Sequence, residues 1–220
     1  TPIGRVERTP SPDYGASIFV WGAPGTTVRD LGKLREGGLR WQKTLFQWRF
    51  LEPQKGRFDW GEADRIVKAS NAQGIKVVAR LDFHPAWARA SGLRNFNGPP
   101  TNYDDFGDFI FAFVDHFKPG SPNGTVDAIE LWNEPNLSRE WGDAAIGPNT
   151  AAEYTRLLCI GHNAAKRASP AVTTVTAGLS PTGVNDNGAR DDLLFLREMY
   201  AAGAKQCFDA LGAHGNTQAP

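Results

Sequence analysis

The chain alternates short apolar runs with longer stretches in which apolar residues recur every three or four positions. Apolar runs of strand length occur at residues 16–22, 39–48, 75–83, 125–132, 171–179 and 207–215. Stretches of helical period occur at residues 29–38, 60–74, 104–117, 150–168 and 191–203. In the third of these, one apolar stripe contains Phe106, Phe109, Ile110, Phe113, Val114 and Phe117. The pattern therefore predicts six strands, and all but the last are followed by a helix.

Strands that read as continuous apolar runs and alternate with helices indicate a parallel sheet covered by helices. The predicted strands start about every 38 residues. An eightfold βα barrel typically takes about 250 residues, and eight units at this spacing need roughly 300. We therefore predict an α/β fold, a (β/α)8 TIM barrel with about the first six βα units in this chain. The alternative is a doubly wound open sheet, but no glycine-rich phosphate-binding fingerprint follows any predicted strand.

The first fifteen residues differ in character from the rest of the chain. They are polar and contain three prolines, so residues 1–15 are interpreted as an N-terminal linker and 16–220 as a C-terminally incomplete barrel domain. A six-stranded remnant would leave two open sheet edges, which favours a fragment over a natural three-quarter barrel. The linker resembles a mature N-terminus, and we therefore expect a secreted or cell-envelope protein.

The composition of this chain of 220 residues narrows the classes of molecule that it could bind. Lys and Arg number 24, as do Asp and Glu, so the zero net charge gives no electrostatic basis for binding nucleic acid. No apolar run approaches the roughly 20 residues of a membrane span.

Cys159 and Cys207 form neither a disulfide framework nor a zinc pattern, and we expect two buried thiols. We expect no metal and no cofactor; the oligomeric state is left open.

The fourth predicted strand ends in an unusual group of polar residues. In a βα barrel the functional residues sit at the carboxyl ends of the strands, and here that end reads Trp132, Asn133, Glu134, Pro135. Proline biases the preceding residue toward extended geometry, which holds Glu134 at the strand exit. A carboxyl in a cleft beside Trp132 and Trp141 would have a raised pKa, as a general acid requires. Asn133 would bond a substrate hydroxyl. A simple turn is the alternative.

Other strand ends supply further candidates for a sugar site. His84 ends the third predicted strand and would contact sugar or cap a loop. Lys43 lies among apolar neighbours in the second strand, so it must snorkel or pair, and it is a candidate cleft residue. Trp48, at the end of the same segment, would stack on a sugar ring or pack in the core, and Trp21 is similar. Trp132 and Trp141 are also candidate substrate-binding residues.

The letters WNEPN at residues 132–136 resemble the acid/base signature of clan A retaining glycoside hydrolases. Residues 37–60, 75–89 and 191–215 resemble other segments of these enzymes, most closely family 39 and its cellulase-like relatives. The resemblance implies that Glu134 is the acid/base, that Asn133 binds the sugar 2-hydroxyl, and that His214 lies near the nucleophile. The family continues His-Pro-Tyr where this chain has His214, Gly215 and Asn216, so one substrate contact differs.

Retaining hydrolysis needs two carboxyl groups about 5–5.5 Å apart. The resemblance places the nucleophile after a seventh strand, and we expect it beyond Pro220. Asp82, Asp186 and Asp209 lie near predicted strand ends, but none is assigned as the nucleophile. The predicted function is a glycosidase that cleaves O-glycosidic bonds in a polysaccharide or glycoside by double displacement. The alternative is a non-catalytic carbohydrate-binding or scaffold protein on a degenerate barrel.

Overall fold

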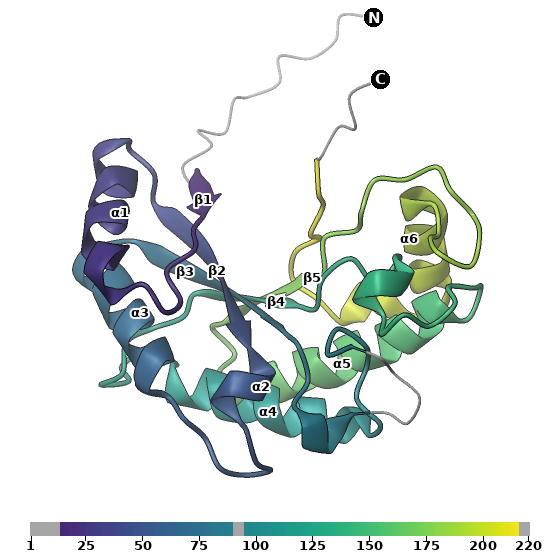
Figure 1. Ribbon diagram of the computed structural model, residues 1–220, viewed down its shortest axis with the longest axis horizontal. Coiled ribbons are helices and arrows are strands. Elements are labelled where there is room, and N and C mark those ends of the chain that lie inside the picture. Colours follow the sequence, from purple (N-terminus) through teal and green to yellow (C-terminus); the bar gives the residue numbers. More distant parts are fainter. Residues whose placement is uncertain (1–13, 90–94, 216–220) are drawn as a thin grey trace, which may run out of the picture.

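The computed structural model describes residues 14–89 and 95–215 (Figure 1). Its centre is one parallel sheet of five strands in the order β1-β2-β3-β4-β5. The strands are β1 (Gly15–Ser17), β2 (Trp41–Gln47), β3 (Lys76–Asp82), β4 (Ala128–Leu131) and β5 (Thr173–Thr176). Each strand therefore pairs with the next strand along the chain.

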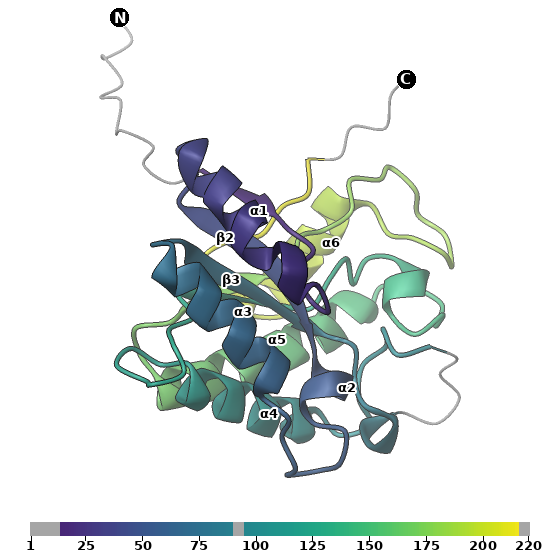
Figure 2. The ribbon, with the colours of Figure 1, turned by 60° about the vertical axis from the view of Figure 1, so that its left-hand side comes forward.

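The helices cover the outer side of this sheet (Figures 1 and 2). They are α1 (Pro24–Glu36), α2 (Trp48–Leu51), α3 (Gly61–Ala72), α4 (Tyr103–His116), α5 (Thr150–Ala168) and α6 (Asp192–Ala201). Right-handed crossovers between strands in unbroken sequence order place successive helices on the same face. A doubly wound sheet would instead reverse its strand order at a switch point. The predicted barrel architecture is confirmed, and the described residues form part of such a barrel.

The core lies between the sheet and its helices. Val77, Ala79 and Leu81 of β3 are fully buried toward the helix side. The apolar stripe predicted for α4 packs there, and its Phe113 meets Phe46 of β2 edge to face at 5.6 Å. Because side chains alternate along a strand, Arg80 of β3 must point to the opposite, inner side of the sheet. The inner side is where a barrel of this kind carries its functional groups.

The last predicted strand, residues 207–215, is only partly formed. It lies beside β5 and makes two isolated parallel bridges, Val175 with Ala210 and Leu179 with Ala213. A side-chain hydrogen bond replaces part of the backbone hydrogen bonding between the two strands, because the Gly212 N–H donates to the Thr176 hydroxyl at 2.9 Å. Residues 1–13 of the predicted linker lie outside the described residues, whereas Gly15 already belongs to β1.

The prediction of two buried thiols is wrong, because Cys159 and Cys207 form a disulfide. Cys159 lies on α5, and Cys207 follows a 3-10 helix at Ala204–Gln206. Their sequence separation of 48 hid the pairing from a spacing rule, but the crossover through β5 and α6 returns the chain to α5. None of the described helices is long and apolar enough to cross a membrane.

Candidate active site

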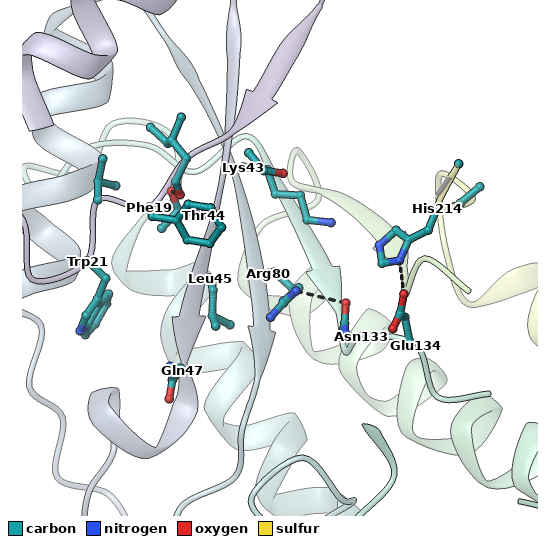
Figure 3. Close-up of a pocket in the computed structure, with 15 residues that line it drawn as sticks. Phe19, Trp21, Lys43, Thr44, Leu45, Gln47, Arg80, Asn133, Glu134 and His214 are labelled. Carbon is teal, nitrogen blue, oxygen red and sulfur yellow. Dashed lines mark hydrogen bonds and ion pairs between the residues drawn. The ribbon is translucent and has the colours of Figure 1, made fainter. Parts of the chain in front are cut away.

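A cleft of about 790 Å³ opens on the inner side of the sheet (Figure 3). Its walls come from the segment after β1, from β2 and β3, from the exit of β4, and from the segment beside β5. The lining residues include 17–21, Lys43, Arg80, Asn133, Glu134 and His214. The structure thus brings together five residues that the sequence singled out, namely Trp21, Lys43, Asn133, Glu134 and His214.

The exit of β4 holds Glu134 in a fixed and strained backbone. Trp132 has φ +81° and Glu134 has φ +38°, both in the left-handed region that costs a side-chain-bearing residue energy. The extended geometry expected for Glu134 before Pro135 is therefore wrong. The Glu134 N–H donates to the Gly178 carbonyl at 3.2 Å, which ties the β4 exit to the β5 exit. Such strain persists only where the surrounding structure enforces it, and it fixes where the carboxyl points.

The Glu134 carboxylate has two nitrogen-bearing neighbours, an imidazole and a guanidinium. His214 Nδ1 lies 2.8 Å from Oε1, and Arg139 Nη2 lies 3.4 Å from Oε2. An ionised carboxylate only accepts hydrogen bonds, so Nδ1 carries the proton in this contact. The hydrogen bond from His214 is the main cause of a lowered Glu134 pKa; partial burial opposes it and Arg139 adds to it. The expectation of a raised pKa is wrong, because an imidazole rather than an indole meets the carboxyl.

Gly178 determines how closely His214 approaches Glu134. A Cβ at Gly178 would lie 2.4 Å from His214 Cδ2, closer than any carbon contact allows. The imidazole therefore occupies space at Gly178 that only glycine leaves open. The Cys159–Cys207 disulfide anchors the chain shortly before His214, so the segment that carries the imidazole is tethered to α5.

Asn133 lies in a network of charged side chains on the inner side of the sheet. Arg80 Nη1 donates to Asn133 Oδ1 at 3.1 Å, and Asn133 Nδ2 donates to Glu140 Oε2 at 3.2 Å. Arg80 Nε forms an ion pair with Asp82 Oδ2 at 3.0 Å. Burial raises the pKa of Asp82 to about 7, while the positive charge of Arg80 opposes that rise.

Lys43 and His84 have different surroundings. Lys43 forms an ion pair with the buried Glu130 of β4 and lines the cleft, as the sequence led us to expect. His84 is fully buried, and its Nδ1 lies 2.6 Å from the Gly98 carbonyl oxygen. His84 therefore holds a loop, the second of its two predicted roles, and is not carried forward as a sugar contact.

Three tryptophans proposed for substrate binding lie in the core instead. Trp48 is fully buried and donates its indole N–H to Glu52 Oε2 at 2.6 Å. Trp132 and Trp141 are 1% and 2% exposed and pack edge to face with ring centroids 6.0 Å apart. Their rings support the β4 exit from behind and present no face to a sugar. Sequence position at a strand end did not reveal which side of the backbone each ring takes.

Sequence reasoning missed three residues that shape the site, Arg80, Arg139 and Glu140. Arg80 could have been noticed, because it is a charged residue inside the apolar run 75–83. Arg139 and Glu140 belong to a 3-10 helix at Ser138–Glu140 that follows the β4 exit. No sequence signal marks that turn, because its contacts with Asn133 and Glu134 are tertiary.

Comparisons with known proteins agree with this fold. Residues 21–87 match a family model described as β-galactosidase of the glycoside hydrolase 42 type. A β-xylosidase from Geobacillus stearothermophilus is 32% identical over 143 residues, which are 61% of this chain and 27% of that protein. The chain thus spans about a quarter of the length of that curated relative. The family-model match ends before Glu134.

Solved structures align with most of this chain. A family 39 glycoside hydrolase from Bacteroides cellulosilyticus aligns with a TM-score of 0.70 at 22% identity, covering 92% of this chain and 38% of that one. A glucosidase from Croceicoccus marinus aligns with a TM-score of 0.65 at 16% identity, covering 91% and 43%. At such identities these structures establish the fold. Together with the sequence matches, they show that the chain is similar to glycoside hydrolases.

Proposed function

We propose that this chain carries the acid/base half of a retaining glycosidase that cleaves O-glycosidic bonds in a polysaccharide or glycoside. The observation that carries the proposal is Glu134, fixed at the β4 exit, facing the cleft and 2.8 Å from His214. In the first step Glu134 gives its proton to the leaving oxygen while a second carboxylate attacks the anomeric carbon. In the second step Glu134, now ionised, takes a proton from the water that releases the sugar.

The lowered pKa of Glu134 has to rise before this residue can act as an acid. Two effects act in that direction in the complex of the full-length protein with substrate. A sugar excludes water from the cleft, and desolvation favours the neutral carboxyl. An ionised nucleophile about 5–5.5 Å away adds like-charge repulsion, which favours the protonated form further.

Asn133, His214 and Lys43 are the proposed substrate contacts, with Asn133 at the sugar 2-hydroxyl. Among the described residues that line the cleft, Glu134 is the only carboxylate. The proposal therefore takes the nucleophile from outside the described part of the chain, beyond Pro220.

The test uses the natural full-length gene product and its Glu134→Ala variant. With an aryl glycoside whose leaving group is poor, removing the acid should lower kcat/KM by about 10²- to 10⁴-fold. A dinitrophenyl glycoside needs no protonation to depart, so its first step should be largely spared, and added azide should restore turnover and yield a glycosyl azide. Glu36→Gln, on the exposed end of α1, is the matched control. Unchanged turnover of the poor substrate by Glu134→Ala would sink the assignment.

A second function, non-catalytic carbohydrate binding, is favoured by the same lone carboxylate of the described cleft. Calorimetry and product analysis on one sample separate the two functions. Heat of binding to an oligosaccharide without any released sugar would support the binding module. Release of sugar that depends on Glu134 would exclude it.

We also propose that the protein works outside the cytoplasm. The Cys159–Cys207 bond supports this, because disulfides persist mainly in oxidising compartments. Fractionation of the native host tests it, and recovery of the protein with reduced thiols in the cytoplasmic fraction would count against it.

A further inference from the structure

We propose that Arg80 is a positioning residue that locks the side-chain amide of Asn133 in one orientation. The locked amide selects substrates that carry a hydroxyl beside the reacting carbon. This inference rests on the proposed function, in which Asn133 meets the substrate.

The lock follows from the two chemically different ends of the amide. Arg80 has only donors, so the end of Asn133 that faces its Nη1 at 3.1 Å must be the oxygen. An ionised Glu140 has only acceptors, so the end that faces its Oε2 at 3.2 Å must be the NH₂ group. A flipped amide would set NH₂ against guanidinium and oxygen against carboxylate, which loses both bonds and adds two repulsions.

Both locking groups are themselves held in place. Asp82, 2% exposed, is the ion-pair partner of Arg80, with Oδ2 3.0 Å from Nε, although this contact is not aligned as a hydrogen bond. Glu140 Oε2 also accepts from Asn97 Nδ2 at 3.3 Å, and the Glu140 carbonyl accepts the Trp132 indole N–H at 3.1 Å. The amide therefore sits between two preoriented charges rather than two mobile side chains.

The orientation leaves Asn133 one amide hydrogen and one oxygen lone pair for a ligand. Asn133 is 8% exposed and lines the cleft, with Arg80 on one side and Glu134 on the other (Figure 3). A sugar hydroxyl both donates and accepts, so it can use either of these remaining sites. A ligand with hydrogen in place of that hydroxyl can use neither, and Arg80 then contributes nothing to its binding.

The test compares a parent aryl glycoside with its 2-deoxy analogue in the natural full-length protein. Arg80→Met should lower kcat/KM for the parent glycoside roughly tenfold to a hundredfold, the loss of one well-oriented hydrogen bond. It should lower kcat/KM for the 2-deoxy analogue by less than about threefold, because that substrate lacks the group being read. Each variant is compared with wild type on the same substrate, so the intrinsic reactivity of the two glycosides cancels.

Controls keep the result interpretable. Arg80→Lys keeps a positive charge against Asp82 but cannot reach two partners with one ammonium, so the same selective loss is expected even if Arg80→Met folds poorly. Arg29→Met, on the exposed side of α1, should leave both rates within about twofold of wild type.

Equal losses on the two substrates in Arg80→Lys, with its unfolding midpoint unchanged, would overturn the inference. Glu134→Ala tests the proposed function and the Arg80 variants test the role of Arg80, so the failure of one proposal can be distinguished from the failure of the other. Without any turnover, calorimetric affinities of parent and 2-deoxy sugars for wild type and Arg80→Lys give the same comparison. A loss of affinity confined to the parent sugar would then support the inference, and equal losses for the two sugars would overturn it.

Discussion

Removing the Cys159–Cys207 disulfide should strongly destabilise the half of the fold that carries His214. The bond closes a loop of 48 residues that contains the end of α5, β5 and α6. In the chain-entropy model a cross-link over such a loop is worth about 4 kcal/mol, and measured losses for native disulfides are roughly 2–5 kcal/mol. Cys207 is 4% exposed, so deleting its sulfur also leaves a small cavity that acts in the same direction.

Urea unfolding of the natural full-length protein and of a Cys159→Ala/Cys207→Ala variant measures this loss. We expect a lower midpoint that corresponds to about 2–4 kcal/mol, and wild type treated with reductant should approach the variant. The position of His214 should become less fixed as well, because His214 follows Cys207 by seven residues and its segment is no longer tethered to α5 in the variant. A change below about 1 kcal/mol in both the variant and the reduced protein would refute the loop-closure reasoning.

Three further predictions concern the site. His214→Phe removes the main cause of the lowered Glu134 pKa, so the basic limb of the kcat/KM profile should move to higher pH; an unmoved limb would contradict this. Because the folded pKa of Glu134 lies below its unfolded value, this contact stabilises the protein above the unfolded pKa. That stability is lost as pH falls through the folded pKa, so the same variant should show a flatter acid unfolding curve. Gly178→Ala places a methyl group 2.4 Å from the His214 ring and should cost about 1–3 kcal/mol while moving the same limb; unchanged stability would show that the ring gives way freely. Asp82→Asn removes a carboxyl whose pKa burial raises from 3.8 to about 7, so wild type should lose stability as pH rises across that window and the variant should not; parallel curves from urea titrations would rule this out.

Much of the fold could be predicted because hydrophobic periodicity is a local signal. The apolar stripe on α4 and the continuous apolar run of β3 can each be recognised from neighbouring residues alone, without knowledge of the other elements. The segment 207–215 was predicted as a full strand because its apolar residues suit one, while Thr176 supplies a side-chain bond in place of part of the ladder. A sequence pattern reports what a segment prefers, and the neighbouring strand decides how much of that preference is realised.

The site divides in the same way. Glu134 and Asn133 could be found because a polar pair at the end of an apolar strand has few structural explanations. Trp48 could not be assigned, because the same residue type at the same kind of position serves a sugar site or the core equally well. The role of Arg80 depends on the register that sets β3 beside β4, and no single segment contains that information.

The sequence by itself determined the βα alternation, the strand-end position of Glu134 and the likeness to clan A glycoside hydrolases, because each depends on residues close together in the chain. Only the tertiary structure decided that Glu134 meets His214, eighty positions away, and that its pKa falls rather than rises. It also decided that the two cysteines are joined. The physical reason is that pKa values and cross-links depend on distance in space, and the crossovers of the barrel bring distant segments to one edge of the sheet.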